Sequence, residues 1–324
     1  MKILINIPTW LGDAVMCTPS ILQLVEFHPS CEITLVGSMI SCEALKTLPN
    51  VKNTVIDNSK KSKIRFLGIK ELGEQLQGHD LAITFRQSIS SALLLNFSNS
   101  PIRIGLGKWY QSFLLSHDYE RPKETHQVKI YTSILESFFK KKFEVKKTKL
   151  NYKRANYKNK TIGINPGASY GNAKRWYPEK FGEVAIHLAQ VADIVIFGGP
   201  AEMDMAADIE KVLVEAKVKN YTNIAGKTKI PELISKIGGL DLFITGDSGP
   251  MHVATAYEIP LVAIFGPTDP QHTHPWNHPK SIMVNKNLEC APCMKRQCPL
   301  SHHQCMKEIS AQEVIEASLS LLDI

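Results

Sequence analysis

The apolar positions of this chain follow two different spacings. Short runs rich in Ile, Leu and Val, typical of buried parallel strands, alternate with longer stretches in which apolar residues recur on one helix face. The runs predict strands at Lys2–Ile7, Glu32–Val36, Thr54–Ile56, Leu81–Phe85, Ile102–Leu106, Thr161–Asn165, Asp193–Phe197, Leu240–Ile244 and Pro260–Phe265. The longer stretches predict helices at Ala14–Phe27, Ser41–Thr47, Gly68–Gln77, His126–Lys140, Pro178–Gln190, Met203–Ala216, Ile230–Ile237, Met251–Tyr257 and Ala311–Leu322. The alternation predicts an α/β protein with doubly wound parallel sheets.

A lysine-rich stretch between Lys140 and Lys160, with few large apolar residues, interrupts this alternation. We interpret it as a connection between two Rossmann-like domains, residues 1–150 and 151–324. Such a pair is expected to hold one substrate on each domain, because small-molecule sites are common at domain interfaces. The last predicted helix, Ala311–Leu322, is free to pack back on the first domain.

The stretch Ile244–Ala256 (ITGDSGPMHVATA) has the strongest chemical signal. It joins a predicted strand to a predicted helix, with Ser248 as a suitable N-cap and Pro250 in the first turn. The open amides and positive dipole end of a helix start bind anions. Because Asp247 and His252 stand beside Gly249 here, the stretch predicts a phosphate site rather than a bare turn.

A second candidate group follows the strands of the first half. Gly12 and Asp13 come after the first strand, and Asp13 is either a helix N-cap or a carboxylate aimed into a cleft. Arg86 ends a neighbouring strand, together with Gln87 and Ser88, and can project into the same cleft. A basic cluster of Lys60, Lys61, Lys63 and Arg65 lies in one loop, on either the ligand-facing or the opposite rim.

Loops of the second half supply further polar candidates. Lys174 follows Ser169 in the loop before a predicted helix, where it is either part of a solvated basic pair or neutralises a diphosphate. Glu202 follows a strand-end Gly-Gly and either stabilises a helix start or accepts hydrogen bonds from a ribose. We find neither G-x-G-x-x-G after a strand nor G-x-x-x-x-G-K-[ST], which disfavours dinucleotide and P-loop sites.

The cysteines divide into two groups. Cys17, Cys31 and Cys42 are scattered and typical of core thiols. The others give the spacing C-x2-C-x4-C-x6-C, formed by Cys290, Cys293, Cys298 and Cys305. That spacing fits a tetrahedral zinc site and also a thiol-rich loop without metal. In either case we expect a structural role, and we assign no metal and no cofactor to the chemistry.

The composition is that of a water-soluble protein. Of 324 residues, 44% are hydrophobic and 21% charged, and no apolar run approaches the ~20 residues that cross a bilayer. The first strand meets Pro8 rather than a cleavage site, so we expect a cytoplasmic protein with reduced thiols. The net charge of +7 suits an anionic partner. The lysines gather in the connection and one loop, which argues against nucleic acid.

Five motifs, in the same order, resemble the ADP-heptose:lipopolysaccharide heptosyltransferases, glycosyltransferase family 9. They are Asn6–Met16, Asn165–Trp176, Asn223–Gly226, Gly246–Ala254 and Pro260–Pro267. The resemblance covers nearly the whole chain and implies the GT-B architecture of two facing Rossmann-like domains. It implies transfer of heptose from ADP-heptose, with inversion, to a heptose of the membrane-anchored inner-core glycolipid. On the basic charge alone, we also expect peripheral contact with the anionic inner membrane face.

The resemblance also implies roles for individual residues. Asp13 matches the catalytic base and Lys174 the lysine on the donor phosphates, with Glu202 near a donor-contacting acid. The expected donor-binding residues are Ser169, Lys174, Glu202, Asp247, Ser248, Gly249 and His252. On charge and position alone, Gly12, Arg86 and Arg103 are expected to meet the acceptor.

Two other functions remain open. One keeps the GT-B fold for an epimerase or a transferase with another donor, and the Asp13 and Lys174 motifs disfavour it. The other is a nucleotide-binding protein without catalysis, which leaves the glycine-rich strand ends unexplained.

Overall fold

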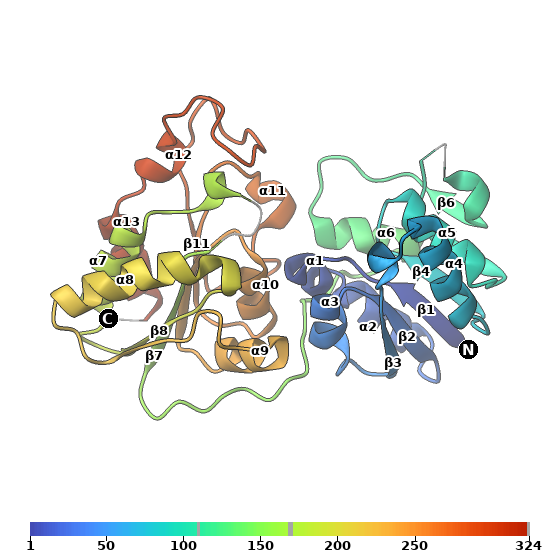
Figure 1. Ribbon diagram of the computed structural model, residues 1–324, viewed down its shortest axis with the longest axis horizontal. Helices are drawn as coiled ribbons and strands as arrows, with labels where there is room; N and C mark the ends of the chain where they lie inside the picture. Colours follow the sequence, from blue (N-terminus) through green and yellow to red (C-terminus); the bar gives the residue numbers. More distant parts are fainter. Residues whose placement is uncertain (109–110, 168–170, 323–324) are drawn as a thin grey trace. The chain divides into compact units, whose positions relative to one another are not determined.

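Each half of the chain builds its own parallel sheet of six strands (Figure 1). The computed structural model describes residues 1–108, 111–167 and 171–322. It divides the chain into two units, Met1–Asn151 and Tyr152–Ile324. The boundary falls within the lysine-rich stretch, where the described residues form no regular element between Lys140 and Lys160.

The first unit alternates strands and helices from its first residue. Its strands are β1 (Lys2–Asn6), β2 (Glu32–Gly37), β3 (Val51–Ile56), β4 (Leu81–Thr84), β5 (Ile102–Leu106) and β6 (His117–Tyr119). Its helices are α1 (Leu11–Met16), α2 (Thr18–Phe27), α3 (Met39–Leu45), α4 (Arg65–Gln75), α5 (Ile89–Phe97) and α6 (Gln127–Phe139), with short 3₁₀ turns η1 (Ser59–Lys61) and η2 (Ser112–Leu114).

The second unit repeats this pattern. Its strands are β7 (Thr161–Asn165), β8 (Asp193–Ile196), β9 (Tyr221–Asn223), β10 (Leu242–Gly246), β11 (Leu261–Ile264) and β12 (Ser281–Val284). Its helices are α7 (Pro178–Leu188), α8 (Met203–Glu215), α9 (Ile230–Gly238), α10 (Gly249–Ala256), α11 (Pro270–Thr273), α12 (Gln304–Lys307) and α13 (Ala311–Leu321), with turns η3 (Asn172–Lys174) and η4 (Pro200–Glu202).

The two sheets have the same strand order. The first runs β3-β2-β1-β4-β5-β6, and the second, read from β9, runs β9-β8-β7-β10-β11-β12. In each sheet the order therefore reverses once, between β1 and β4 and between β7 and β10. Loops leave such a point in opposite directions and open a crevice at the carboxyl ends of the strands. Each unit thus has one place where a ligand site is expected.

Apolar helix faces cover the sheets. In the first unit α4 and α5 pack on one sheet face, where Leu4, Val36 and Ala82 join their leucines in one buried cluster. The helices α2 and α6 pack on each other, and the hydroxyls of Ser20 and Thr132 meet there at 3.2 Å. In the second unit α7, α8 and α13 share a core with β7, β8, β10 and β11. The isoleucine-rich strands therefore fold as their continuous hydrophobicity predicts.

The predicted helix Ala14–Phe27 is wrong in one respect, because it is two helices that meet at Cys17. Pro19 has no N–H to donate to the carbonyl of Val15, as a continuous helix requires. The hydroxyl of Thr18 donates to that carbonyl instead, at 2.7 Å. The axis of the short helix α1, which carries Asp13, is therefore not fixed by the axis of α2.

Other differences from the predicted elements have simple causes. The strands β6, β9 and β12 are short edge strands, and β6 and β9 (HDY and YTN) contain no apolar run. Helix α5 was not predicted, although Ser88 caps it by accepting a hydrogen bond from the amide of Ser91. Helix α13 buries Val314 and Ile315 in the core of the second unit.

Among the described residues, no helix combines the length and the apolar composition that crossing a membrane requires.

Helix α10 is buried along most of its length. Its residues Met251–Thr255 are buried, and His252 is only 3% exposed. Burial lowers the pKa of His252 to about 4 against the opposing charge of Asp247, and the charges of Lys174 and His274 add smaller lowering effects. The imidazole is therefore neutral in the folded protein near neutral pH.

This burial predicts a pH-dependent stability. The unfolded chain takes up a proton near the ordinary His252 pKa of 6.5, whereas the folded chain does so only near pH 4. Stability should therefore fall as pH drops from 6.5 toward 4, by about 2 kcal/mol at pH 5. His252→Gln should remove this part of the fall, measured from urea midpoints at pH 7 and pH 5.

The control is His187→Gln, which replaces an exposed histidine on α7 and should keep the wild-type fall. Equal pH dependence in wild type and His252→Gln would contradict the prediction.

Candidate active site

Asp13 stands where the first sheet reverses its strand order. It is the third residue of α1, which follows β1, and its side chain is partly exposed. The N-cap of α1 is Trp10, which makes no side-chain capping hydrogen bond. The interpretation of Asp13 as an N-cap is therefore wrong. Its carboxylate belongs to the first turn of the helix.

A buried tyrosine holds this carboxylate. The hydroxyl of Tyr131, on α6, donates to Oδ1 of Asp13 at 3.0 Å. Burial and the charge of Asp13 raise the pKa of Tyr131 well above its ordinary value, so the phenol keeps its proton and stays a donor. Burial likewise raises the pKa of the neighbouring Cys17 thiol, which stays neutral. One oxygen of Asp13 is thus oriented by Tyr131.

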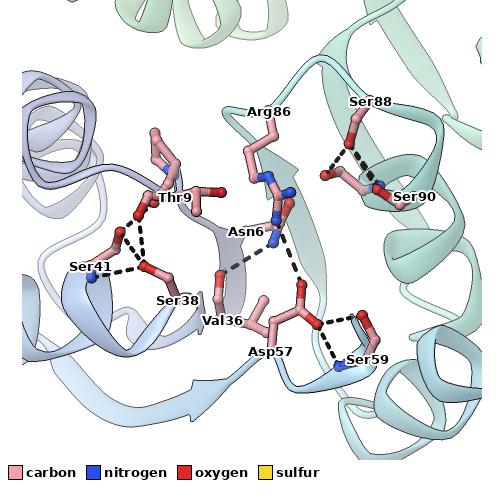
Figure 2. A network of polar contacts seen from close by, with 12 residues as sticks. Asn6, Thr9, Val36, Ser38, Ser41, Asp57, Ser59, Arg86, Ser88 and Ser90 are labelled. Atoms are coloured by element: carbon pink, nitrogen blue, oxygen red, sulfur yellow. Dashed lines mark hydrogen bonds and ion pairs between the residues drawn. The ribbon is translucent and has the colours of Figure 1, made fainter. Parts of the chain in front are cut away.

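The loop that leads from β1 to α1 is tied to the end of the neighbouring strand β2 (Figure 2). The hydroxyl of Ser38 caps α3 and donates to the carbonyl of Thr9 at 2.7 Å. The hydroxyl of Ser41 donates to the carbonyl of Pro8 at 2.5 Å. These two bonds fix the chain just before α1, and so fix where Asp13 points.

Arg86 lies across the same reversal, after β4. Figure 2 shows its guanidinium pointing toward Asp57, with Nη1 3.6 Å from Oδ2. Burial lowers the pKa of Arg86, and the charge of Asp57 opposes that shift. The adjacent Phe85 ring packs edge-on against Tyr131 at 5.3 Å. The aromatic pair therefore connects the Arg86 strand end to the tyrosine that holds Asp13.

The position of Asp57 settles which rim carries the basic cluster. Asp57 follows β3 and pairs with Arg86, so the residues after it start at the carboxyl edge of the sheet. Oδ1 of Asp57 accepts hydrogen bonds from the amide and hydroxyl of Ser59, at 3.0 and 2.6 Å. We call residues 59–67 the basic turn. It lies on the ligand-facing rim.

The structure does not bring Arg103 to this group. Arg103 is the second residue of β5, near the amino end of the strand. Its guanidinium donates to the carbonyls of Ser100 and Leu114, at 2.7 and 3.1 Å. These bonds brace loops at the opposite edge of the sheet. Gly12, by contrast, is buried beside Asp13 in the first turn of α1.

In the second unit, Lys174 and Asp247 meet at the other reversal. Lys174 ends η3, after β7, and its ammonium donates to Oδ2 of Asp247 at 2.6 Å and to the Asp247 carbonyl at 3.2 Å. Thr268, after β11, donates to the same Oδ2 at 2.7 Å. Asp247 is only 6% exposed, so this buried carboxylate needs both partners. The pair places the lysine charge beside the start of α10.

The start of α10 is arranged differently from a capped helix. Ser248 is the N-cap residue but makes no side-chain capping bond. Its hydroxyl instead lies 3.0 Å from that of Thr245. Pro250, in the first turn, has no amide hydrogen. The amide of Met251 donates to the carbonyl of Ser248 at 3.2 Å. The Ser248 side chain does not cap the helix, so the amide of Gly249 is the first-turn donor best placed to meet an anion.

Glu202 is buried at a third strand end. Its Oε2 accepts a 2.6 Å hydrogen bond from the amide of Gly199, after β8. The backbone of Gly167, after β7, lies so close that a Cβ there would be 2.1 Å from Cγ of Glu202. The expected stabilisation of a helix start is thus present, as a bond to the turn before α8. Ser169 lies outside the described residues.

The cysteine-rich segment packs against the turn that carries Lys174. The carbonyl of Arg296 accepts from the amide of Ala173 at 3.1 Å, and Nε2 of His303 lies 2.9 Å from the Ala173 carbonyl. Nδ1 of His303 is 3.1 Å from the hydroxyl of Tyr177. The segment therefore clamps the η3 turn from both sides of Ala173.

The thiols of this segment influence one another electrostatically. Burial raises the pKa of Cys305 to about 11, and the charges of Cys290, Cys293 and Cys298 add to that rise. Backbone amides, that of His303 above all, lower the pKa of Cys298. In the part of the chain that the structure describes, no three His, Cys, Asp or Glu side chains are grouped to hold a metal ion.

Several partners of the site were not predicted from the sequence. Tyr131, Asp57 and Thr268 act only through contacts with residues far along the chain. Tyr131 stands in an amphipathic helix like any core residue, so no local pattern singles it out. Thr268 does follow a predicted strand, in the loop Gly-Pro-Thr-Asp, and its place at a strand end is the one sequence feature that points to a role in the site.

Comparison with known proteins agrees with this geometry. The model of glycosyltransferase family 9 (heptosyltransferase) matches residues 69–304. A lipooligosaccharide heptosyltransferase 2 from Campylobacter jejuni is 38% identical over 98% of both chains. A lipopolysaccharide heptosyltransferase 2 from Escherichia coli is 26% identical over 99% of each chain.

A solved structure gives the same result for the fold. The structure of E. coli ADP-heptose lps heptosyltransferase II matches with a TM-score of 0.86 and 25% identity, over 99% of this chain and 98% of that one. The expected GT-B fold class is confirmed, and so is the resemblance on which it rested. Paired Rossmann-like units, their ligand-facing strand ends and these matches together show that the chain is a glycosyltransferase that belongs to family 9, the heptosyltransferases.

Proposed function

We propose that the chain transfers heptose from ADP-heptose to a heptose of the lipopolysaccharide or lipooligosaccharide inner core, inverting the anomeric centre. The observation that carries this proposal is the 38% sequence identity, over 98% of both chains, to a lipooligosaccharide heptosyltransferase 2. The two polar groups support it, because one offers a carboxylate and the other a lysine beside a helix start. The acceptor glycolipid is anchored in a membrane, so the enzyme works in the cytoplasm at the inner membrane face.

In the proposed reaction Asp13 is the general base. The acceptor hydroxyl gives its proton to the Asp13 carboxylate while its oxygen forms a bond to the anomeric carbon. The hydroxyl of Tyr131 donates to Oδ1 and so fixes the orientation of the carboxylate. Arg86 and Gly12 complete the acceptor side, with Arg86 supplying positive charge for acidic groups of the core. Arg103 is left out of this side because of its place in β5.

The donor side stabilises the leaving group. As the bond between the anomeric carbon and the diphosphate oxygen breaks, its electron pair stays on ADP. Lys174 and the first amides of α10, from Gly249 onward, meet this developing charge. Asp247 and Ser248 orient the lysine and the helix start. His252, buried and neutral within α10, is proposed to contribute to the donor site from the second turn of the helix. Ser169 and the acid Glu202 are proposed to contact the donor.

The carboxylate role is tested by Asp13→Asn. The amide keeps the shape and can still accept from Tyr131, but it cannot take a proton. Turnover with ADP-heptose and a one-heptose inner-core acceptor should fall about 10²–10⁴-fold. Affinity for ADP, measured by calorimetry, should stay the same. Near-normal turnover in a folded variant would end the assignment.

The matched control is Asp80→Asn, at the amino end of β4, where the carboxylate accepts from the amide of Lys2. It should leave turnover unchanged. Tyr131→Phe keeps the base but removes its orienting bond, so its loss of turnover should be smaller than that of Asp13→Asn.

Variants of the Lys174–Asp247 ion pair can separate an effect on ADP binding from an effect on the stability of the fold. Lys174→Ala should weaken ADP binding and slow transfer. It should also destabilise the fold by about 3 kcal/mol, because it leaves the buried Asp247 carboxylate without its partner. Adding Asp247→Asn should restore much of the stability, seen as a recovered melting temperature, but not ADP affinity. Recovery of both would show that Lys174 has only a structural role.

A further inference from the structure

The basic turn combines positive charge with exposed apolar side chains. Its cations, all exposed, are Lys60, Lys61, Lys63 and Arg65. Between and after them stand Ile64, Phe66 and Leu67, which are 58%, 50% and 45% exposed. Ile89, at the start of α5, adds a fourth apolar side chain that is 48% exposed. The Nη2 atom of Arg65 donates to Ser90 at 3.3 Å, so the two helix starts are neighbours.

The lysines of the basic turn have no acidic neighbour close by in the sequence. No acidic residue occurs between Asp57 and Glu71, and Asp57 is engaged by Arg86 and Ser59. Among the described residues, no carboxylate lies within ion-pair distance of the ammonium groups of Lys60, Lys61 or Lys63. The basic turn is therefore a locally cationic surface.

The turn is built into the fold. Hydrogen bonds from Ser59 to Asp57 fix η1 to the end of β3. A Cβ at Gly68 would lie 2.7 Å from Cβ of Ser62, so glycine lets α4 pack directly under the turn. The Phe66 ring packs edge-on against Phe97 at 5.5 Å. The apolar side chains are therefore presented from a fixed backbone rather than from an unsupported loop.

We infer that the basic turn docks the enzyme on an anionic phospholipid bilayer. Lysines near such a surface are attracted to the anionic headgroups, and apolar side chains gain affinity by burying methylenes among the acyl chains. A glycan or nucleic acid would pair with the cations but leave Ile64, Phe66 and Leu67 in water. A protein partner is disfavoured because lysine is depleted from protein interfaces. A bilayer surface uses both kinds of side chain.

The inference deepens the proposed function and rests on it in one respect. The turn follows the strand end whose Asp57 pairs with Arg86, on the rim proposed to meet the acceptor. Docking there would bring that rim to the membrane in which the acceptor is anchored. Transfer to a lipid-embedded acceptor should then depend on the turn, whereas transfer to a deacylated acceptor in solution should not.

The charge is tested by co-sedimentation of the full-length protein with vesicles. Wild type should bind phosphatidylglycerol-containing vesicles and not pure phosphatidylcholine. Replacing Lys60, Lys61 and Lys63 with Gln should weaken this partitioning at least about tenfold. The matched control replaces the exposed Lys211, Lys217 and Lys219 of the second unit with Gln. Both variants lose three positive charges, so equal loss in both would reduce the effect to net charge and overturn the inference.

Insertion is tested by fluorescence. Phe66→Trp should show an additional blue-shifted emission on anionic vesicles, relative to wild type. Val214→Trp, at a position on α8 that is 58% exposed, should show none. An unshifted Phe66→Trp would overturn the inference. A blue shift of the Phe66→Trp emission without lipid, together with concentration-dependent self-association in sedimentation velocity, would also overturn it. The turn would then bind a second copy of the chain.

Activity separates this inference from the proposed function. The Lys60, Lys61 and Lys63 variant should lose transfer to acceptor in vesicles and retain transfer to the deacylated acceptor. Equal transfer to both acceptors would overturn docking. Failure of wild type to use either acceptor would instead refute the proposed function, and vesicle binding would still decide the docking.

Discussion

The reversal of strand order in each parallel sheet is the constraint on which the site depends. Because all strands of a sheet run the same way, their carboxyl ends share one edge, and the connections diverge where the order reverses. Asp13 and Arg86 follow the strands on either side of one reversal, and Lys174 and Asp247 those on either side of the other. Without this arrangement, residues far apart in the chain would not meet.

Buried partner residues orient the side chains that are proposed to act in the reaction. The hydroxyl of Tyr131 orients the Asp13 carboxylate, and the Asp247 carboxylate orients the Lys174 ammonium. Each partner is buried, so its hydrogen bond is stronger than it would be in water and holds a single geometry. The less buried member of each pair, Asp13 or Lys174, is the one proposed to meet a substrate. The cysteine-rich segment helps to position Lys174 indirectly, because His303 contacts the backbone of the turn that carries this lysine.

Much of this could be predicted from the sequence, and the remainder depends on contacts that no local pattern encodes. Strand runs such as Ile3–Ile5 and Leu242–Ile244 are apolar throughout because both sheet faces are covered, so they are recognisable. The edge strands β6 and β9 bury little and were missed. Arg103 was grouped with Arg86 on charge alone, but the strand register places it toward the other end of its strand. Nothing in the sequence distinguishes Tyr131 from the other buried residues of its helix.

The most direct test of the whole account is a time course of transfer by the purified enzyme. Incubation with ADP-heptose and a one-heptose inner-core acceptor should raise the acceptor mass by one heptosyl unit, with one ADP released for each acceptor converted. Release of ADP without a change in acceptor mass, or conversion with another sugar nucleotide and none with ADP-heptose, would contradict the account.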